Sequence, residues 1–157
     1  MQTQTPIQTP IMSSPMEFDG GWDLVTWGDE YITGNDGMDF DHQRLVALFN
    51  AFAMAVNAGH GDVVIRDVLD ELTEYTRYHF SREEQLMQES GYPGYERHKK
   101  MHDTFIRQID GAGHYLGVGG GMSAFLLSFL ARWLGSHVLG ADRELGHFLA
   151  GGDAAGH

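Results

Sequence analysis

The sequence predicts an all-α protein, an antiparallel up-down-up-down four-helix bundle that follows an irregular N-terminal arm. Four segments carry apolar residues at the helical spacing of three and four positions, and short connections that contain glycine separate them. No segment of the sequence sustains the apolar–polar alternation of a half-buried strand. A chain of 157 residues, 42% of them hydrophobic, is long enough to form one domain with its own core.

The chain ahead of the first helix divides into a tail and an arm. Residues 1–15 are mostly Gln, Thr, Ser and Pro, so we expect a disordered tail. Residues 18–38 place two tryptophans and a tyrosine among Gly, Asp and Asn, which predicts an irregular arm held by aromatic side chains. We expect the bundle and its arm to span residues 16–150, and residues 151–157 to form a flexible C-terminus.

Stripes of residues on one face predict the first two helices. The first ends at residues 57–61, and the second begins near Asp62, a candidate N-cap. Gly91 and Pro93 end the second helix, because glycine favours the left-handed turn and proline cannot continue a helix. The two stripes contain His42, Leu45, Phe49, Phe52 and Val56, and then Val68, Leu72, Tyr75, His79, Glu83 and Leu86.

The third and fourth helices show the same spacing. The third begins near Tyr95 and fades into the glycine-rich residues 111–121. The fourth begins near Met122 and ends before Gly151 and Gly152. The two stripes contain His98, Met101, His102, Phe105 and Ile109, and then Leu126, Phe129, Leu130, Trp133, His137, Leu145 and Phe148.

Composition excludes several classes of partner and site. The chain has 22 acidic and 10 basic residues, a net charge of −12, and no Lys or Arg before Arg44. Nucleic acids and anionic membrane surfaces are recognised by basic patches, so we expect neither partner. The absence of cysteine rules out disulfides, thiolate metal sites and cysteine nucleophiles.

Membrane insertion and secretion are not expected either. The most apolar stretch, residues 124–134, is interrupted by Arg132 and is too short to span a bilayer. The N-terminal residues lack the basic and apolar regions of a secretory signal, so we expect a cytoplasmic protein.

Histidine distinguishes the predicted core. Each of the four helices carries histidine on its core-facing stripe, and two pairs of polar residues, His79 with Glu83 and His98 with His102, are four positions apart on one helix face. A single histidine on an apolar face is more often a hydrogen-bonded core residue than a metal ligand. Burying several such groups without partners would cost about 1–3 kcal/mol each, against a total stability of about 5–15 kcal/mol. Coordination of a transition metal removes this cost.

The candidate ligands suit two adjacent metal ions bridged by carboxylates. Seven donors exceed the four that a tetrahedral zinc takes, although the ligand types alone leave iron, manganese and zinc open. In a regular α-helix Asp142 would lie roughly 140° around the axis from His137. Either a π-bulge or a carboxylate that reaches sideways would bring it to the cluster. The candidates are His42, His79, Glu83, His98, His102, His137 and Asp142.

The residues around these ligands resemble the hemerythrins, and in particular the single-domain bacteriohemerythrins, from Trp27 to Leu149. All four segments that carry the candidate ligands occur in the same order as in the hemerythrins, which makes the resemblance specific. Myohemerythrin is itself a known example of the up-down-up-down bundle. The matching segments are W-G-D-E-Y and M-D-F-D-H, which ends at His42, H-F-S-R-E-E-Q-L-M from His79, Y-P-G-Y-E-R-H-K-K-M-H-D-T-F from Tyr92, and W-L-G-S-H-V-L-G-A-D from Trp133.

The resemblance implies a centre of two iron ions with an oxo or hydroxo bridge. The two-histidine iron would have the open position where dioxygen binds. The implied function is reversible dioxygen binding for storage, transport or delivery, not enzymatic turnover, with dioxygen and an oxygen-consuming recipient protein as partners. The implied ligands are His98, His102 and His137 for one iron, His42 and His79 for the other, and Glu83 and Asp142 as bridges.

Two other functions stay open. The hemerythrin fold also serves in oxygen or redox sensing, which here would need a separate partner. The other alternative is a di-iron oxidase, or an activity on peroxide or nitric oxide, although histidine-rich coordination favours reversible binding.

Two positions depart from the family pattern. Bacterial members often have Gln before the first-helix histidine, where this chain has Asp41. This carboxylate could orient His42, but we expect it to face solvent. Gly140 stands where animal oxygen carriers usually have a bulky leucine over the dioxygen pocket. The glycine predicts a more open pocket and faster autoxidation.

Overall fold

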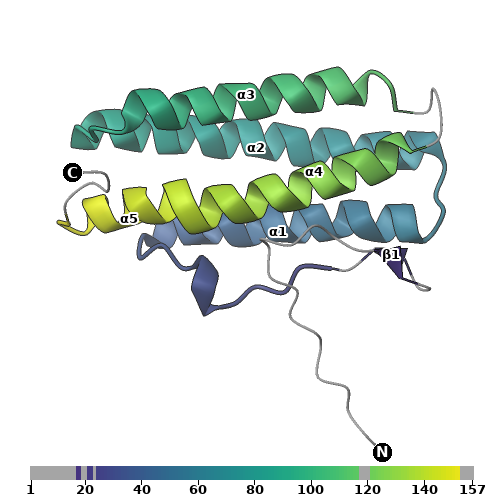
Figure 1. Cartoon of the computed structure of the whole chain (residues 1–157), viewed down its shortest axis with the longest axis horizontal. Coiled ribbons are helices and arrows are strands. Elements are labelled where there is room, and N and C mark those ends of the chain that lie inside the picture. Colours follow the sequence, from purple (N-terminus) through teal and green to yellow (C-terminus); the bar gives the residue numbers. More distant parts are fainter. Residues whose placement is uncertain (1–16, 19–20, 23, 117–120, 153–157) are drawn as a thin grey trace, which may run out of the picture.

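The computed structural model describes residues 17–18, 21–22, 24–116 and 121–152. Its main helices run alternately in opposite directions and form one bundle, which confirms the predicted fold class (Figure 1). The expected disordered tail, residues 1–15, lies outside the described residues, and so does most of the expected flexible C-terminus.

The first three bundle helices are single α-helices and the fourth is composite. Helices that are neighbours in the sequence pack side by side, and α4 also packs against α1 and closes the bundle. The helices are α1 (Asp36–Asn57), α2 (Asp62–Ser90), α3 (Tyr95–Gly113) and a continuous run of α4 (Met122–Ser136), the π-helical turn η2 (His137–Asp142) and α5 (Arg143–Leu149).

Local residues explain the helix ends. The side chain of Asn35 accepts a hydrogen bond from the backbone N–H of Met38 at 2.9 Å, so α1 begins before residue 38, inside the expected irregular arm. Gly91 adopts φ 68° and ends α2 as predicted. Asp62 is not the N-cap of α2: Gly61 occupies that position, and Asp62 is the first helical residue, where its negative charge still favours the helix N-terminus.

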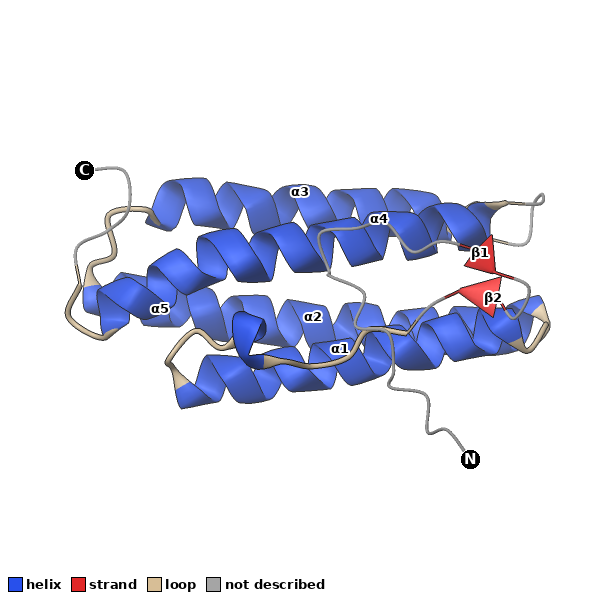
Figure 2. Ribbon diagram, turned by 60° about the horizontal axis from the view of Figure 1, so that its bottom comes forward, coloured by secondary structure: helices blue, strands red, loops and turns tan. Residues whose placement is uncertain are grey.

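The N-terminal arm runs along α1 (Figure 2). The side chain of Asn50 bonds to both the backbone N–H and the carbonyl of Val25, each at 2.8 Å. Tyr31 is buried with its ring 5.3 Å from that of Trp27, so aromatic residues hold the arm as expected. The arm is not wholly irregular, because it contains the 3-10 turn η1 (Asp29–Tyr31) and a short pair of antiparallel strands, β1 (Glu17–Phe18) and β2 (Gly21–Trp22).

The apolar core has two parts. The larger part fills most of the bundle and includes the fully buried Phe49, Phe52 and Leu126. The smaller part consists of Met38, Met87, Tyr92 and Leu145. Buried polar residues from all four bundle helices lie among these apolar side chains, so a polar layer interrupts an otherwise apolar interior.

The composite fourth helix, Met122–Leu149, is long and apolar enough to cross a membrane by length and composition, with a mean hydropathy of 1.3 over a window of 18 residues. It extends well beyond residues 124–134 because the helix continues through the π-helical turn. Core helices of bundles pass the same test, and this helix supplies His137 and Asp142 to the buried polar layer.

Candidate metal centre

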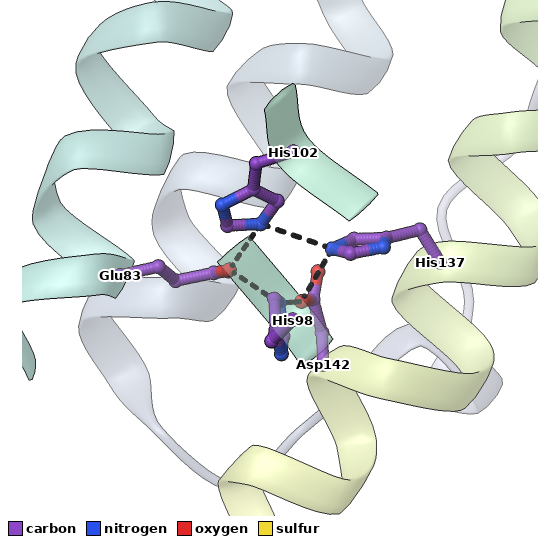
Figure 3. A group of neighbouring side chains, drawn as sticks. All are labelled: Glu83, His98, His102, His137 and Asp142. Carbon is purple, nitrogen blue, oxygen red and sulfur yellow. Dashed lines mark hydrogen bonds and ion pairs between the residues drawn. The ribbon is translucent and has the colours of Figure 1, made fainter. Parts of the chain in front are cut away.

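The polar layer consists of side chains from all four bundle helices. All seven candidate ligands predicted from the sequence point into it, and none is more than 4% exposed. Figure 3 shows five of them, converging from α2, α3 and η2. The seven are His42 on α1, His79 and Glu83 on α2, His98 and His102 on α3, and His137 and Asp142 on η2.

The π-helical turn η2 explains how Asp142 reaches the cluster. Its hydrogen bonds join residues five apart instead of four, so a spacing of five residues stays on one face. Nε2 of His137 therefore lies 3.1 Å from Oδ1 of Asp142. Of the two arrangements that the sequence left open, the structure shows the π-bulge.

The ligand atoms fall into two groups that share both carboxylates. Within each group, the candidate donor atoms all lie within 4.8 Å of one another. Three histidines belong to one group and two to the other. The groups are Glu83, His98, His102, His137 and Asp142, and His42, His79, Glu83 and Asp142.

Glu83 directs one oxygen to each group. Its Oε1 lies 3.1 Å from Nε2 of His98 and 3.2 Å from Nε2 of His102. Its Oε2 lies 2.7 Å from Nε2 of His79 and 3.3 Å from Nε2 of His42. A carboxylate in this position can bridge two cations.

Asp142 divides its oxygens in the same way. Oδ1 lies 3.0 Å from Nε2 of His98, and Oδ2 lies 2.9 Å from Nε2 of His42. Each of the two carboxylates therefore faces both the three-histidine group and the two-histidine group, a position from which it could bridge two cations.

The buried carboxylates of Glu83 and Asp142 stabilise positive charge on the histidines of the cluster. Burial alone lowers the pKa of His42, but Asp142 and Glu83 outweigh burial and raise it to about 10. His79 and His98 are affected in the same way, with pKa values of about 9. Burial by itself raises the pKa of Glu83, yet the surrounding histidines, His79 above all, hold it well below its ordinary value. Burial dominates at His137, whose pKa is lowered.

The buried donor atoms of the cluster make contacts that a metal ion would improve. Nε2 of His79 and Oδ1 of Asp142 lie within ion-pair distance of neighbouring side chains, but neither makes a hydrogen bond of regular geometry among the described residues. Nε2 of His102 lies 3.1 Å from Nε2 of His137. Because Nδ1 of His102 donates to Glu84, its Nε2 is the nitrogen with a free lone pair when the ring is neutral. Imidazole nitrogens and carboxylate oxygens are ligands that iron accepts, so the donor set fits an iron site.

Asp41 does not face solvent, so that prediction is wrong. It is 2% exposed, and its Oδ2 accepts a hydrogen bond from Nδ1 of His79 at 2.9 Å. Its Oδ1 accepts from the hydroxyl of Tyr75 at 3.0 Å. Asp41 thus orients His79 on the neighbouring helix and not His42 beside it, and leaves Nε2 of His79 free to bind a metal.

Sequence reasoning missed three further residues that hold the histidines. Oε2 of Glu84 accepts a hydrogen bond from Nδ1 of His102 at 2.8 Å. The ring of Phe80 stacks on His102 with centroids 3.7 Å apart, and Trp133 stacks on His137 at 4.2 Å. The regular apolar spacing placed Trp133 on the core-facing stripe but did not include Phe80, and for neither residue did it indicate a contact with histidine.

Gly140 lies within η2 and is exposed. A Cβ atom at this position would meet no atom within 4 Å. The space is therefore open, while the interpretation that it controls a dioxygen pocket stays a prediction.

Comparison with known proteins agrees with this geometry. The family model of the hemerythrin HHE cation binding domain matches residues 33–149, which include all seven candidate ligands. The chain belongs to this family. A bacteriohemerythrin from Stenotrophomonas maltophilia is 33% identical over 120 residues, which cover 76% of this chain and 78% of the relative. A bacteriohemerythrin from Clostridium acetobutylicum is 30% identical and covers 77% of this chain and 98% of the relative.

More distant hemerythrins are also similar. A hemerythrin from Themiste dyscrita is 38% identical over 88 residues, which cover 56% of this chain and 71% of the relative. A crystal structure of a hemerythrin variant has the same fold, with a TM-score of 0.66 at 24% identity, covering 78% of this chain and 95% of that one.

Proposed function

We propose that this hemerythrin-family protein binds dioxygen reversibly at a non-haem di-iron centre, and that it stores, transports or delivers oxygen in the cytoplasm without enzymatic turnover. One observation carries the proposal: five buried histidines divide unequally between two groups of donors that share Glu83 and Asp142. Hemerythrins are known for dioxygen binding at a di-iron site, and the family match supports the same ligand here.

The ligand assignment follows the two groups. His98, His102 and His137 would hold one iron, and His42 and His79 the other. Glu83 and Asp142 would bridge the two ions beside an oxo or hydroxo bridge. Bound there, the ions would supply the electrons that dioxygen binding needs and recover them on release. The smaller histidine set provides the place where an additional ligand fits.

The chain supports this chemistry by fixing the ligands and excluding water. Asp41 and Glu84 hold Nδ1 of His79 and His102, so each ring offers Nε2 to the cluster. Phe80 and Trp133 cover two of the rings from the core side. Apolar side chains around the site limit the access of solvent. Solvent that reached the site would promote oxidation of the iron.

An oxygenation cycle tests the proposal. The iron-loaded protein is reduced without oxygen, exposed to air and then deoxygenated, while its visible spectrum and iron content are measured. We expect two irons per chain, colour that appears with air and loss of that colour when oxygen is removed. Colour that persists after deoxygenation would instead favour an oxidase or a sensor.

The recipient of the oxygen is proposed by class only, as an oxygen-consuming protein. A pull-down from cell extract, with and without oxygen, tests for it. Recovery of an oxygen-consuming enzyme supports delivery, and an oxygen-dependent signalling partner supports sensing.

A further inference from the structure

We propose that metal ions reach and leave the buried cluster through a polar cleft between the start of α1 and the C-terminal half of α2, and that the side chain of Arg82 closes this cleft. The proposal deepens the proposed function, because it rests on metal binding at the cluster.

The cleft connects the surface with two of the candidate ligands. It has a volume of about 200 Å³, and His79 and Glu83 form part of its wall. Asp41, Gln85 and Glu89 line it as well. An apolar cavity on the other side of the cluster, at Leu45, Thr76 and Trp133, includes none of the seven candidate ligands. A charged species is therefore better accommodated along the cleft beside His79.

Arg82 spans this cleft from α2 towards the first turn of α1. Its Nη1 donates a hydrogen bond to the hydroxyl of Tyr78 at 2.9 Å, and its guanidinium carbon lies 5.5 Å from the centre of that ring. Its Nε lies 3.6 Å from Oδ2 of Asp41. A Cβ atom at Gly37 would lie 3.2 Å from Nη2 of Arg82, so the glycine leaves space for the guanidinium against α1.

The closure is weak enough to open. The Arg82 side chain is 46% exposed, and exposed ion pairs are held loosely because water competes for both charges. The long side chain can leave Asp41 without moving a helix. Opening would uncover the cleft wall next to His79 while the bundle stays intact.

The charge of the cleft selects a cation. Three carboxylates, those of Asp41, Glu83 and Glu89, line the cleft against the two basic side chains of Arg82 and His79, and the whole chain carries a net charge of −12. Such a potential raises the local concentration of a divalent cation and speeds its arrival. Displacement of Arg82 also moves a positive charge away from the outer part of the path. Dioxygen is uncharged and gains nothing from this potential.

Rates of metal transfer test the route. Metal-free protein is mixed with Co²⁺ in a stopped-flow instrument, uptake is followed by the visible bands of the bound ion, and a chelator then removes the metal. We expect Arg82→Ala to accelerate both uptake and removal by roughly fivefold, the change that loss of one exposed ion pair can produce. The number of ions bound at equilibrium should not change.

Arg77→Ala is the matched control. Arg77 lies on the same helix with a side chain 50% exposed, and it pairs with Asp110 on α3, outside the cleft. The substitution removes the same charge, and we expect wild-type rates. Arg82→Lys keeps the charge but loses the planar fork that reaches Tyr78 and Asp41, so it should also accelerate transfer.

Removal of a negative charge from the cleft gives a second test of the route. We expect Glu89→Gln to slow uptake about twofold, with the difference disappearing at high salt. Equal rates for Arg82→Ala and Arg77→Ala, with normal stoichiometry, would overturn the route but not the metal site. Failure of the wild-type protein to bind two ions would overturn the proposed function instead.

Discussion

Asp41 connects the first helix to a histidine of the second. Because it accepts a hydrogen bond from the Nδ1–H group of His79, it fixes the ring orientation and the nitrogen available to a metal. We expect Asp41→Asn to weaken binding of the second metal ion about 10- to 100-fold, the usual effect of losing such a partner. Competition with a chelator of known affinity measures this effect. Asp70→Asn, an exposed change on α2, is the control, and an affinity equal to wild type in Asp41→Asn would contradict the role.

Gly140 carries a second prediction at the scale of one residue. A Cβ atom at this position meets no atom within 4 Å, so the backbone of Gly140 can accept a side chain. We expect Gly140→Leu to slow autoxidation, because the leucine limits the access of water to the proposed dioxygen site. The decay of the oxygenated spectrum in air gives the rate. A rate that is unchanged or faster in the variant would refute the pocket interpretation.

The sequence predicted the candidate ligands better than the residues that support them. On each helix the candidate ligands other than Asp142 share a stripe with apolar residues, so spacing alone brings the histidines to the core. Asp41 lies next to His42 in the sequence, about 100° around α1, and its partners are on α2. Only the packing of α1 against α2 decides that such a position is buried, and a single sequence does not contain that information.

The π-helical turn η2 is the element that completes the cluster. It keeps His137 and Asp142 on one face at a spacing of five residues. Deletion of Ala141 would shorten the spacing to four, which a regular α-helix also keeps on one face. We therefore expect the deletion variant to bind two metal ions.

Insertion of one alanine after Ala141 provides the opposite case. A spacing of six residues turns the carboxylate roughly 240° from His137 in an α-helix, so we expect loss of at least one of the two ions. Metal analysis of the purified variants decides between the cases. Two ions in the insertion variant, or none in the deletion variant, would show that the turn does not position Asp142.

The boundaries of the elements were predictable where single residues determine them. Gly91 ends α2 and Tyr95 begins α3, as expected. The start of α1 differed because Asn35 caps the helix within a segment whose composition resembles a loop. The π-helical turn could be stated only as one of two alternatives, because its signal was the misfit of Asp142 with regular helical spacing.

At the scale of the whole molecule, the buried polar layer links stability to metal. Glu83 and Asp142 are 1% exposed in the middle of the bundle, and metal-free protein must satisfy both with protonated histidines. A ligand that binds only the folded state at 1,000 times its Kd stabilises that state by about 4 kcal/mol. For a chain of this size, the melting temperature should rise by roughly 10 °C.

Thermal unfolding with iron and after chelation, under anaerobic conditions, measures this shift. His60→Ala, a change at an exposed residue between α1 and α2, should retain the full difference. Equal melting temperatures with and without iron would mean that metal binding does not stabilise the fold.

Anomalous diffraction from crystals of the iron-loaded protein tests the central claim most directly. We expect two iron peaks inside the bundle, one contacted by His98, His102 and His137 and the other by His42 and His79, with Glu83 and Asp142 touching both. A single peak, or iron bound outside these seven side chains, would contradict the di-iron centre and the dioxygen binding proposed from it.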